Sequence, residues 1–536
     1  MARYHKIAWA LAALPLIAAV IFVHRFAGPL PLTDEWSYTH ALRLWHGLDL
    51  TSWEGISTAW ENYPARHSEH LVVLPFIVYA PLMELFSYDS RIIIYLTVAS
   101  FAALAFLFRP VFKTNPWLWG LVCLILFCPS HYMEFMWAWQ ITLTWSVLFP
   151  VLGLYTIDRR ETVTPIRNTF WGILAISLGT LSSAGGFFGF PAALLLVLLR
   201  ENSIKTKLIQ SAVVAGGSIL IYTTLMSSAA HELSAGTREF WYILTVLGVT
   251  LWGTPVAVTE FRPDSTSIGG LLVLIALSAV LVRIVVIKKW AELALPLSIT
   301  IFGFLSIAPI AISREYLGNW HLQYALPIFC GGLATAYTLH RLDRSKWSLS
   351  ALSLLVVLLG SSLVGYVQGF NKHGPVYRAY VQGIEEYTQM KLSEHWRGRS
   401  YPEQHPDRDM DLDLILFLAA HDHPTLQVDF GSDDLAPLPP RSRVWINNEP
   451  QSLPLPFADG PKGSGRVRVI VGIPSDENIT LIVGQNPQFQ TTLRRVHPGH
   501  FPDIETTEQY SLFVADIFNA SRSAVDSELQ FLVVRK

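Results

Sequence analysis

Long apolar runs separated by short polar segments dominate the first two thirds of the chain. A helix needs roughly 20 apolar residues to cross a bilayer, because each residue advances it by about 1.5 Å. We therefore predict a mainly α, polytopic membrane protein with about eleven transmembrane helices. The predicted spans are 7–27, 91–108, 116–131, 137–157, 168–185, 186–200, 207–227, 268–287, 292–312, 320–338 and 347–367.

Two further apolar stretches, 71–86 and 240–258, are ambiguous. If both are surface-lying or re-entrant, the remaining short loops alternate in charge, and each loop on one side holds two or three basic residues. Basic loops mark the cytoplasmic side. The pattern thus predicts a cytoplasmic N-terminus, two long exterior loops at 28–90 and 228–267, and an exterior C-terminus. The first apolar segment has no small-residue cleavage site after it, so we expect an uncleaved anchor.

The pattern changes after Tyr366. Apolar and aromatic residues recur at helical spacing across 371–398, which predicts an amphipathic helix. From about residue 425, short β-prone segments alternate with turns rich in Pro, Gly and Asp. We predict a transmembrane domain at 1–367, a helical linker at 368–424 and a periplasmic β-rich, sandwich-like domain at 425–536. The predicted strand segments are TLQVDF, SRVWIN, GRVRVIVGI, NITLIVG, YSLFVADIF and ELQFLVV.

Composition agrees with a membrane protein. Hydrophobic residues make up 51% of the chain and charged residues only 15%, against roughly 25% charged in soluble domains. The formal net charge of −2 gives no reason to expect a nucleic-acid partner. The three cysteines, Cys123, Cys128 and Cys330, lie in apolar runs, so we expect buried thiols and neither disulfides nor a metal site.

The stretch PLTDEWSYTH, 31–40, directly follows the first apolar run and holds two adjacent acids, Asp34 and Glu35. A carboxylate at a membrane face is costly unless it is hydrated, paired or used. Transfer of a sugar from a lipid phosphate needs a base that deprotonates the acceptor hydroxyl, and we predict that Asp34, with Glu35 beside it, is catalytic. The alternative is structural: Thr33 or Asp34 could cap a helix at 35–47.

A second candidate segment is ENYPARHSEHLVVLP, 61–75. His67 and His70 are three residues apart with Glu69 between them, so in a helix the two histidines would share a face. We predict that the three bind substrate. Their spacing matches no established metal site, and no protein metal site is predicted. The alternative is the polar first turn of an interfacial helix.

A third segment, PSHYMEFMWAWQ, combines aromatic rings with polar groups at 129–140. Glu134, Trp137 and Gln140 recur at roughly one helix face, and aromatic plates with polar tips suit sugar rings. We predict substrate contacts for these three residues. An ordinary interfacial Trp belt is the alternative.

A fourth segment, SREYLGNWHLQY at 313–324, holds a basic residue on the side that has few. A guanidinium suits a lipid phosphate because it is always charged and binds bidentately. We predict that Arg314 binds the donor phosphate, with Arg262 of the second long loop as a further candidate. His321 and Tyr324 fall on one face of the following helix and are predicted substrate contacts. Pairing of Arg314 with Glu315 is the alternative.

With these residues in view, the layout of residues 1–367 resembles the GT-C superfamily of membrane glycosyltransferases. Members have many spans, a long first exterior loop with an acid pair just after the first helix, and often an exterior C-terminal domain. Asp34–Glu35 occupies the acid position and 28–90 the loop. ENYPARHSEHLVVLP and SREYLGNWHLQY are also similar to a group of uncharacterised bacterial GT-C-like proteins. There an Asn-Glu-His-Arg run occupies the place of Ser68–Glu69–His70–Leu71, so this chain lacks that arginine.

The resemblance implies a polyprenyl-phosphate sugar as donor, Asp34 as base, and transfer on the periplasmic side of a bacterial inner membrane. The acceptor would be a glycan, lipid or protein, and the C-terminal domain a carbohydrate-binding or acceptor-docking module. The cofactor is left open: a divalent cation could assist Arg314, although the sequence does not require one. No P-loop, G-x-S-x-G or Cys/His zinc pattern is present in the sequence.

The sequence leaves two other functions open. A transporter or flippase of a lipid-linked or polar solute predicts ionisable residues at mid-membrane depth and inverted repeats. A noncatalytic assembly protein predicts that Asp34 and Arg314 are far apart and dispensable.

Overall fold

The structure is a computed structural model of the 536-residue chain. It describes residues 2–396 except 33, 47, 49–51, 62–65, 68–69, 160–164, 227–236, 254–256, 259–264 and 314–316, together with Leu418 and the strands named below. The chain divides into two compact units. The first comprises 1–28, 65–79 and 90–380, and the second comprises 29–64, 80–89 and 381–536.

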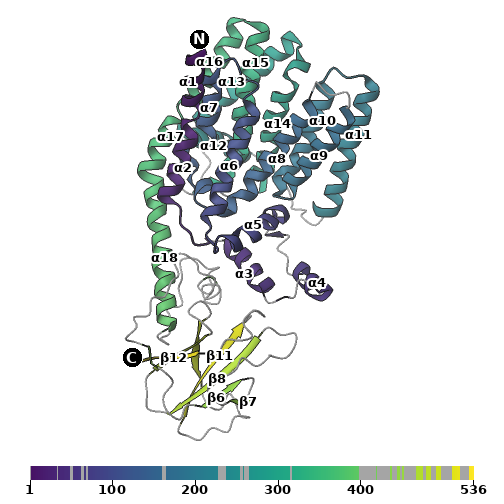
Figure 1. Ribbon diagram of the computed structural model, residues 1–536. Helices are drawn as coiled ribbons and strands as arrows, with labels where there is room; N and C mark the ends of the chain where they lie inside the picture. The colour runs from purple at the N-terminus through teal and green to yellow at the C-terminus, as the bar shows by residue number, and fades with distance from the viewer. Residues whose placement is uncertain are drawn as a thin grey trace. The chain divides into compact units, whose positions relative to one another are not determined.

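The first unit is built of helices that pack side by side, with α8, α9, α10 and α11 neighbouring one another (Figure 1). Its helices are α1 (Ala2–Ala12), α2 (Leu14–Phe26), α6 (Arg91–Phe108), α7 (Pro116–Leu126), α8 (Ile141–Asp158), α9 (Pro165–Thr180), α10 (Gly189–Leu199), α11 (Ile204–Ile221), α12 (Thr237–Trp252), α13 (Ser265–Ile287), α14 (Trp290–Ser313), α15 (Leu326–Asp343), α16 (Lys346–Gly360) and α17 (Leu363–Gln368). Helices α5 (Val73–Leu85) and α18 (Gly374–Trp396) have residues in both units.

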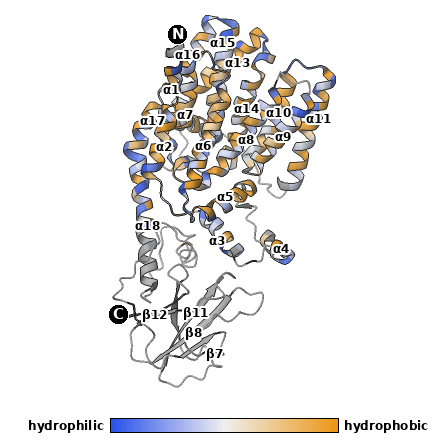
Figure 2. Ribbon diagram, viewed as in Figure 1, coloured by the Kyte–Doolittle hydropathy of each residue, from blue (hydrophilic) through white to orange (hydrophobic). Residues whose placement is uncertain are grey.

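Seven helices of the described residues are long and apolar enough to cross a membrane, or eight if the bent pair of α7 and the following short helix is one span. Figure 2 shows the apolar residues that run along them. The chain is therefore a mainly α, membrane-integrated protein. Three of the eleven predicted spans are missing even from the larger number. α10 has only 11 residues and α9 only 16, so neither has the length of a straight span. The predicted span 320–338 corresponds to α15, which is not among the qualifying helices.

The two ambiguous stretches form short helices, α5 and α12. A surface-lying position is wrong for α12, because Tyr242, Leu244, Leu247 and Leu251 each have no exposed surface. This helix is enclosed by α13, α14 and α17. Phe240 near its start is exposed, whereas residues 244–251 are all buried.

Short non-α segments interrupt the helices of the first unit. They are the 3₁₀ segments η1 (Pro129–Phe135), η2 (Ala138–Gln140), η3 (Ala184–Phe188) and η5 (Asn319–Ala325), and the π segments η4 (Tyr222–Met226) and η6 (Gly369–His373). Helix α7 ends at Leu126, and η1 continues from Pro129 at an angle of 59°. Irregular backbone at membrane depth is tolerated only where protein or a cavity surrounds it. Accordingly, every residue of η1 is buried.

The three cysteines are buried and free, as predicted. Close helix contacts depend on small residues. A Cβ added to Gly153 of α8 would lie 2.5 Å from the carbonyl oxygen of Gly172 in α9. Glycines at such contacts let two helix backbones approach closely, which drives association where lipid surrounds the helices.

An ion pair joins the ends of α13 and α15. The Arg283 guanidinium donates two hydrogen bonds to Asp343, from Nε to Oδ2 at 2.9 Å and from Nη2 to Oδ1 at 2.6 Å. Ser345 donates a further hydrogen bond to this carboxylate. The two hydrogen bonds from Arg283, with that from Ser345, hold the pKa of Asp343 well below its ordinary value of 3.8.

We expect Asp343→Asn to lower the free energy of unfolding at neutral pH, because the charged form of Asp343 makes these bonds. A depressed folded-state pKa stabilises the protein above the unfolded-state value, and this contribution is lost as pH falls toward the folded-state value. The difference between wild type and variant should therefore stay constant above about pH 5 and shrink in stronger acid. Detergent-unfolding curves over a pH series measure it. Glu292→Gln is the control, because its pairing with Lys289 is solvent-exposed and contributes little.

The second unit contains α3 (Glu35–His46) and α4 (Trp53–Glu61). The Trp45 indole donates a hydrogen bond to the carbonyl of Ala59 at 3.2 Å, which joins the two helices. Its strands are β5 (Leu435–Ala436), β6 (Arg443–Ile446), β7 (Glu449–Gln451), β8 (Arg466–Pro474), β9 (Ile479–Gly484), β10 (Gln490–Val496), β11 (Tyr510–Phe518) and β12 (Gln530–Arg535).

These strands form one antiparallel sheet in the order β5-β12-β9-β10-β11-β8-β6-β7. Five of them, β6, β8, β9, β11 and β12, lie at predicted strand segments. The pattern did not predict the short β5 and β7 or the polar β10, and the predicted strand 425–430 lies outside the described residues.

Candidate functional site

The acid pair follows the first apolar helices closely. Helix α2 ends at Phe26, and six residues, 27–32, lead to the turn at Asp34. The Asp34 side chain is partly exposed, whereas Glu35 is 1% exposed and begins α3. The Glu35 amide donates to the carbonyl of Leu32 at 3.0 Å, which forms a tight turn around Asp34. An acid in the first turn of α3 also agrees with the structural alternative, since it complements the helix dipole.

The two histidines of the second segment lie on strands, not on a helix. β1 (Arg66–His67) and β2 (His70–Leu71) form an antiparallel hairpin in which His67 and His70 are direct partners. The helical placement is therefore wrong, because the two histidines lie on paired strands. The hairpin still brings His67 and His70 together. Glu69 lies outside the described residues.

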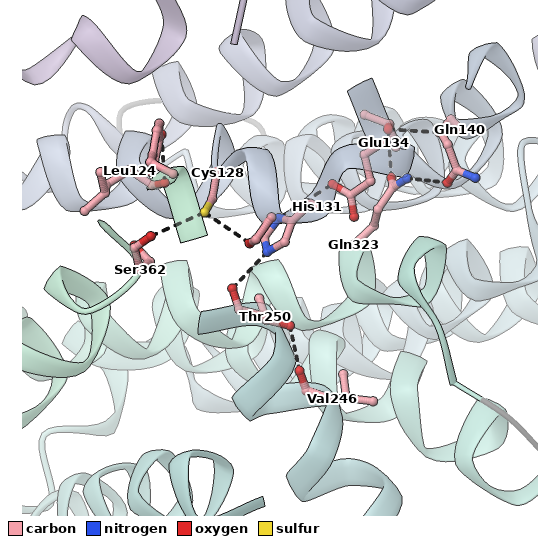
Figure 3. A network of polar contacts seen from close by, with 12 residues as sticks. Leu124, Cys128, His131, Glu134, Gln140, Val246, Thr250, Gln323 and Ser362 are labelled. Carbon is pink, nitrogen blue, oxygen red and sulfur yellow. Dashed lines mark hydrogen bonds and ion pairs between the residues drawn. The ribbon is translucent and has the colours of Figure 1, made fainter. Parts of the chain in front are cut away.

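Glu134, Trp137 and Gln140 lie at the break between α7 and α8 and are all buried. They do not share one helix face, because η1 ends at Phe135 and Trp137 has an extended backbone before η2 begins. Gln323 of η5 donates from Nε2 to Gln140 Oε1 at 2.8 Å, and Thr144 donates to Gln323 Oε1 at 2.7 Å. Figure 3 shows this chain of polar groups beside Glu134.

His321 and Tyr324 are likewise buried, and both hydrogen-bond to protein groups. His321 Nδ1 accepts from the amide of Gly318 at 3.3 Å and lies 3.2 Å from the hydroxyl of Tyr242. The Tyr324 hydroxyl lies 3.1 Å from both Ser146 and Ser183. These bonds fix η5 against α8, α12 and the residues just before η3.

Arg262 and Arg314 lie outside the described residues, but the segments beside them are paired. β3 (Ala257–Val258) and β4 (Leu317–Gly318) form a short antiparallel ladder. The chain leaves this ladder toward Arg262 after Val258 and enters it from Arg314 before Leu317, and Val258 and Leu317 are direct partners. Tertiary structure thus joins the second long loop to the segment after α14.

Sequence reasoning missed His131, which lies next to Glu134 in space. Its Nε2 is 2.9 Å from the carbonyl of Thr250 in α12, and its Nδ1 is 3.8 Å from Glu134 Oε2. Both side chains have no exposed surface. Across the part of the chain that the structure describes, neither Glu134 oxygen has a hydrogen-bond partner. The available signal was a His and a Glu three residues apart, shortly after Pro129 and between two apolar runs.

The described residues contain no group of three or more His, Cys, Asp or Glu side chains arranged to hold a metal ion. Of the predicted site residues they include Asp34, Glu35, Glu134, Trp137, Gln140, His321 and Tyr324, and the backbone of His67 and His70. Gln140 is brought next to the segment of His321 and Tyr324 through Gln323. The structure is thus that of a polytopic membrane protein. Several of its buried polar side chains lie in the 3₁₀ segments between helices, namely Glu134, Gln140, His321 and Gln323.

Comparison with known proteins finds two solved structures that are similar to this chain. One is the archaeal oligosaccharyltransferase AglB from Archaeoglobus fulgidus in complex with an inhibitory peptide and a dolichol-phosphate, with 12% identity and a TM-score of 0.41 over 76% of this chain and 60% of that one. The other is the Archaeoglobus fulgidus oligosaccharyltransferase in the apo form, with 12% identity and a TM-score of 0.42 over 75% of this chain and 58% of that one.

This chain thus spans about three fifths of the length of either archaeal protein. No family model and no curated protein matches it. TM-scores this low do not establish a shared fold, so the function proposed below depends on the residues themselves.

Proposed function

We propose that the chain is a membrane glycosyltransferase that moves a sugar from a polyprenyl-phosphate donor to a glycan, lipid or protein acceptor. Asp34 takes the proton of the acceptor hydroxyl, and that oxygen then attacks the anomeric carbon of the donor sugar. The bond from this carbon to the phosphate oxygen breaks, and the leaving phosphate keeps the electron pair. Arg314, with Arg262, stabilises its charge.

The observation that supports this proposal most directly is the position of Asp34. Its carboxylate is partly exposed in a turn eight residues after the end of a membrane-spanning helix, while Leu32 and Glu35 on either side are buried. A base that serves a lipid-borne substrate must lie at the depth of the lipid phosphate and be reachable by a hydroxyl. A partly exposed acid that follows a span by only eight residues is suited to both needs.

The β3–β4 ladder supports the assignment of the phosphate site. It holds the chain ends that lead to Arg262 and Arg314 side by side, although the two residues are 52 positions apart in the sequence. Two guanidinium groups on adjoining segments would neutralise one phosphate better than either alone. A divalent cation remains open as a further contributor.

We assign a supporting role to Gln140, His321 and Tyr324. Because their hydrogen bonds go to protein groups, they fix η5, which begins five residues after Arg314. In this proposal the reaction takes place on the periplasmic side of a bacterial inner membrane. The C-terminal strands belong to a sandwich-like module that docks the acceptor.

Arg314→Gln should raise the donor KM about ten- to hundredfold, the value of one or two charge-assisted hydrogen bonds. Arg314→Lys should recover part of this loss, because it keeps the charge but not the fork of donors. The assay is sugar transfer in proteoliposomes that contain a polyprenyl-phosphate sugar. Arg167→Gln is the matched control, because Arg167 is an exposed arginine in the first turn of α9. A donor KM unchanged in Arg314→Gln would remove this residue from the phosphate site.

One observation favours a second candidate function, a transporter or flippase for a lipid-linked or polar solute. Glu134 is an ionisable residue buried at a bend between two apolar helices, and such residues often mark transport paths. Movement of a fluorescent lipid-linked sugar between leaflets, without acceptor and without sugar transfer, would favour this function over the transferase.

A further inference from the structure

The C-terminal end of α12 is held by two consecutive residues of η1. The carbonyl of Thr250 belongs to the last turn of α12, where carbonyls lack partners within the helix. His131 Nε2 lies 2.9 Å from it, so Nε2 carries a hydrogen and donates it. Gly253 then adopts a φ of +78°, and a Cβ added there would lie 2.7 Å from the Cβ of Ser130. The position thus requires glycine for both its backbone angle and its contact.

The other ring nitrogen of His131 faces Glu134. A neutral imidazole has one donor and one acceptor, so donation from Nε2 leaves Nδ1 as an acceptor, 3.8 Å from Glu134 Oε2. An ionised carboxylate facing that lone pair would be a buried, uncompensated charge. The pair therefore carries one proton, on Nδ1 of the ring or on the carboxyl, although at 3.8 Å the two atoms are in contact and not hydrogen-bonded. In both forms the pair is neutral overall, and its members attract each other.

We propose that Glu134 and His131 form a positioning pair that fixes the β3–β4 ladder. The attraction between the ring and the Glu134 carboxyl group orients the ring, and the ring holds the last turn of α12 through its hydrogen bond to Thr250. From Gly253 the chain continues to β3, only four residues further on. The effect on donor binding rests on the proposed function, because Arg262 and Arg314 adjoin the ladder. The pair would then set donor affinity without touching the donor.

Hydrogen exchange of the backbone amides at 250–258 and 317–318 tests the pairing directly. Glu134→Leu removes the carboxyl group that orients the ring. Loss of the hydrogen bond from Nε2 to Thr250 should then speed exchange there about tenfold, the value of one hydrogen bond of about 1.4 kcal/mol. Glu134→Gln should stay close to wild type, because its amide can donate to Nδ1. Exchange across α9 reports global unfolding and should not change. His131→Phe keeps a ring of similar shape but also removes the pair, so it should speed exchange at the same amides.

Wild-type exchange at the ladder in both Glu134→Leu and His131→Phe would overturn the proposal, as would equal loosening in Glu134→Gln and Glu134→Leu. The donor KM separates this inference from the proposed function. Faster exchange with a raised donor KM supports both. Faster exchange with an unchanged donor KM supports the positioning pair and counts against a phosphate site at the ladder.

Discussion

Asp34→Asn should lower the rate of sugar transfer by about 10²- to 10⁴-fold, the usual contribution of a positioned general base. The amide has nearly the same shape as the carboxylate but cannot accept the acceptor's proton. Donor KM should change little, because the phosphate is assigned to arginines elsewhere. Purified protein in proteoliposomes, supplied with a polyprenyl-phosphate sugar and a hydroxyl acceptor, allows kcat and KM to be measured separately.

Asp89→Asn is the matched control for this experiment. Asp89 also lies in the segment between the first two predicted spans and is also partly exposed, but it has no assigned role in the reaction. It should transfer sugar at the wild-type rate. Transfer at the wild-type rate by correctly inserted Asp34→Asn would remove Asp34 from the mechanism and leave the proposed function without its base.

Gly270→Ala should destabilise the first unit by about 3 kcal/mol, the upper end for overpacking a tight core. A Cβ at Gly270 of α13 would lie 1.9 Å from the carbonyl oxygen of Leu244 in α12, and real Cβ atoms essentially never come closer than 3.0 Å. The two helices would have to separate, because the atom that is met belongs to the backbone. Loss of helical circular dichroism during titration with a denaturing detergent measures the effect.

Gly216→Ala is the control for this packing effect. Gly216 lies on an exposed face of α11, and nothing is within 4 Å of an added Cβ. Alanine there should stabilise the helix by roughly 0.5–1 kcal/mol, because it restricts the unfolded chain. The two variants should thus shift the unfolding midpoint in opposite directions. A loss in Gly270→Ala no larger than about 0.5 kcal/mol would contradict the close α12–α13 contact.

The membrane character of the chain could be predicted from hydropathy, but the number of spans could not. The runs at 91–108 and 268–287 became α6 and α13 almost residue for residue, because uninterrupted apolar helices satisfy their own backbone hydrogen bonds. The apolar run at 116–131 predicts a single helix. Pro129 cannot donate to the preceding turn, and the chain bends there into η1.

The candidate site likewise has some features that the sequence could predict and others that it could not. The sequence alone placed Asp34 and Glu35 directly after an apolar helix, since this depends only on chain order. It assigned Glu134 and Gln140 to one helix face, an inference that fails once 3₁₀ turns replace the α period. His131 carried only a weak local signal, because its partners Glu134 and Thr250 become neighbours through the packing of η1 on α12.

By itself, then, the sequence determined that this is a polytopic, mainly α protein with an acid pair beside its first helix and β-prone segments near its end. Apolar length and local periodicity suffice for these features, because both act between residues close in the chain. Tertiary structure alone decided the buried position of α12, the β3–β4 ladder and the meeting of His131 with Glu134. These depend on contacts between residues far apart in the chain, which no local pattern encodes.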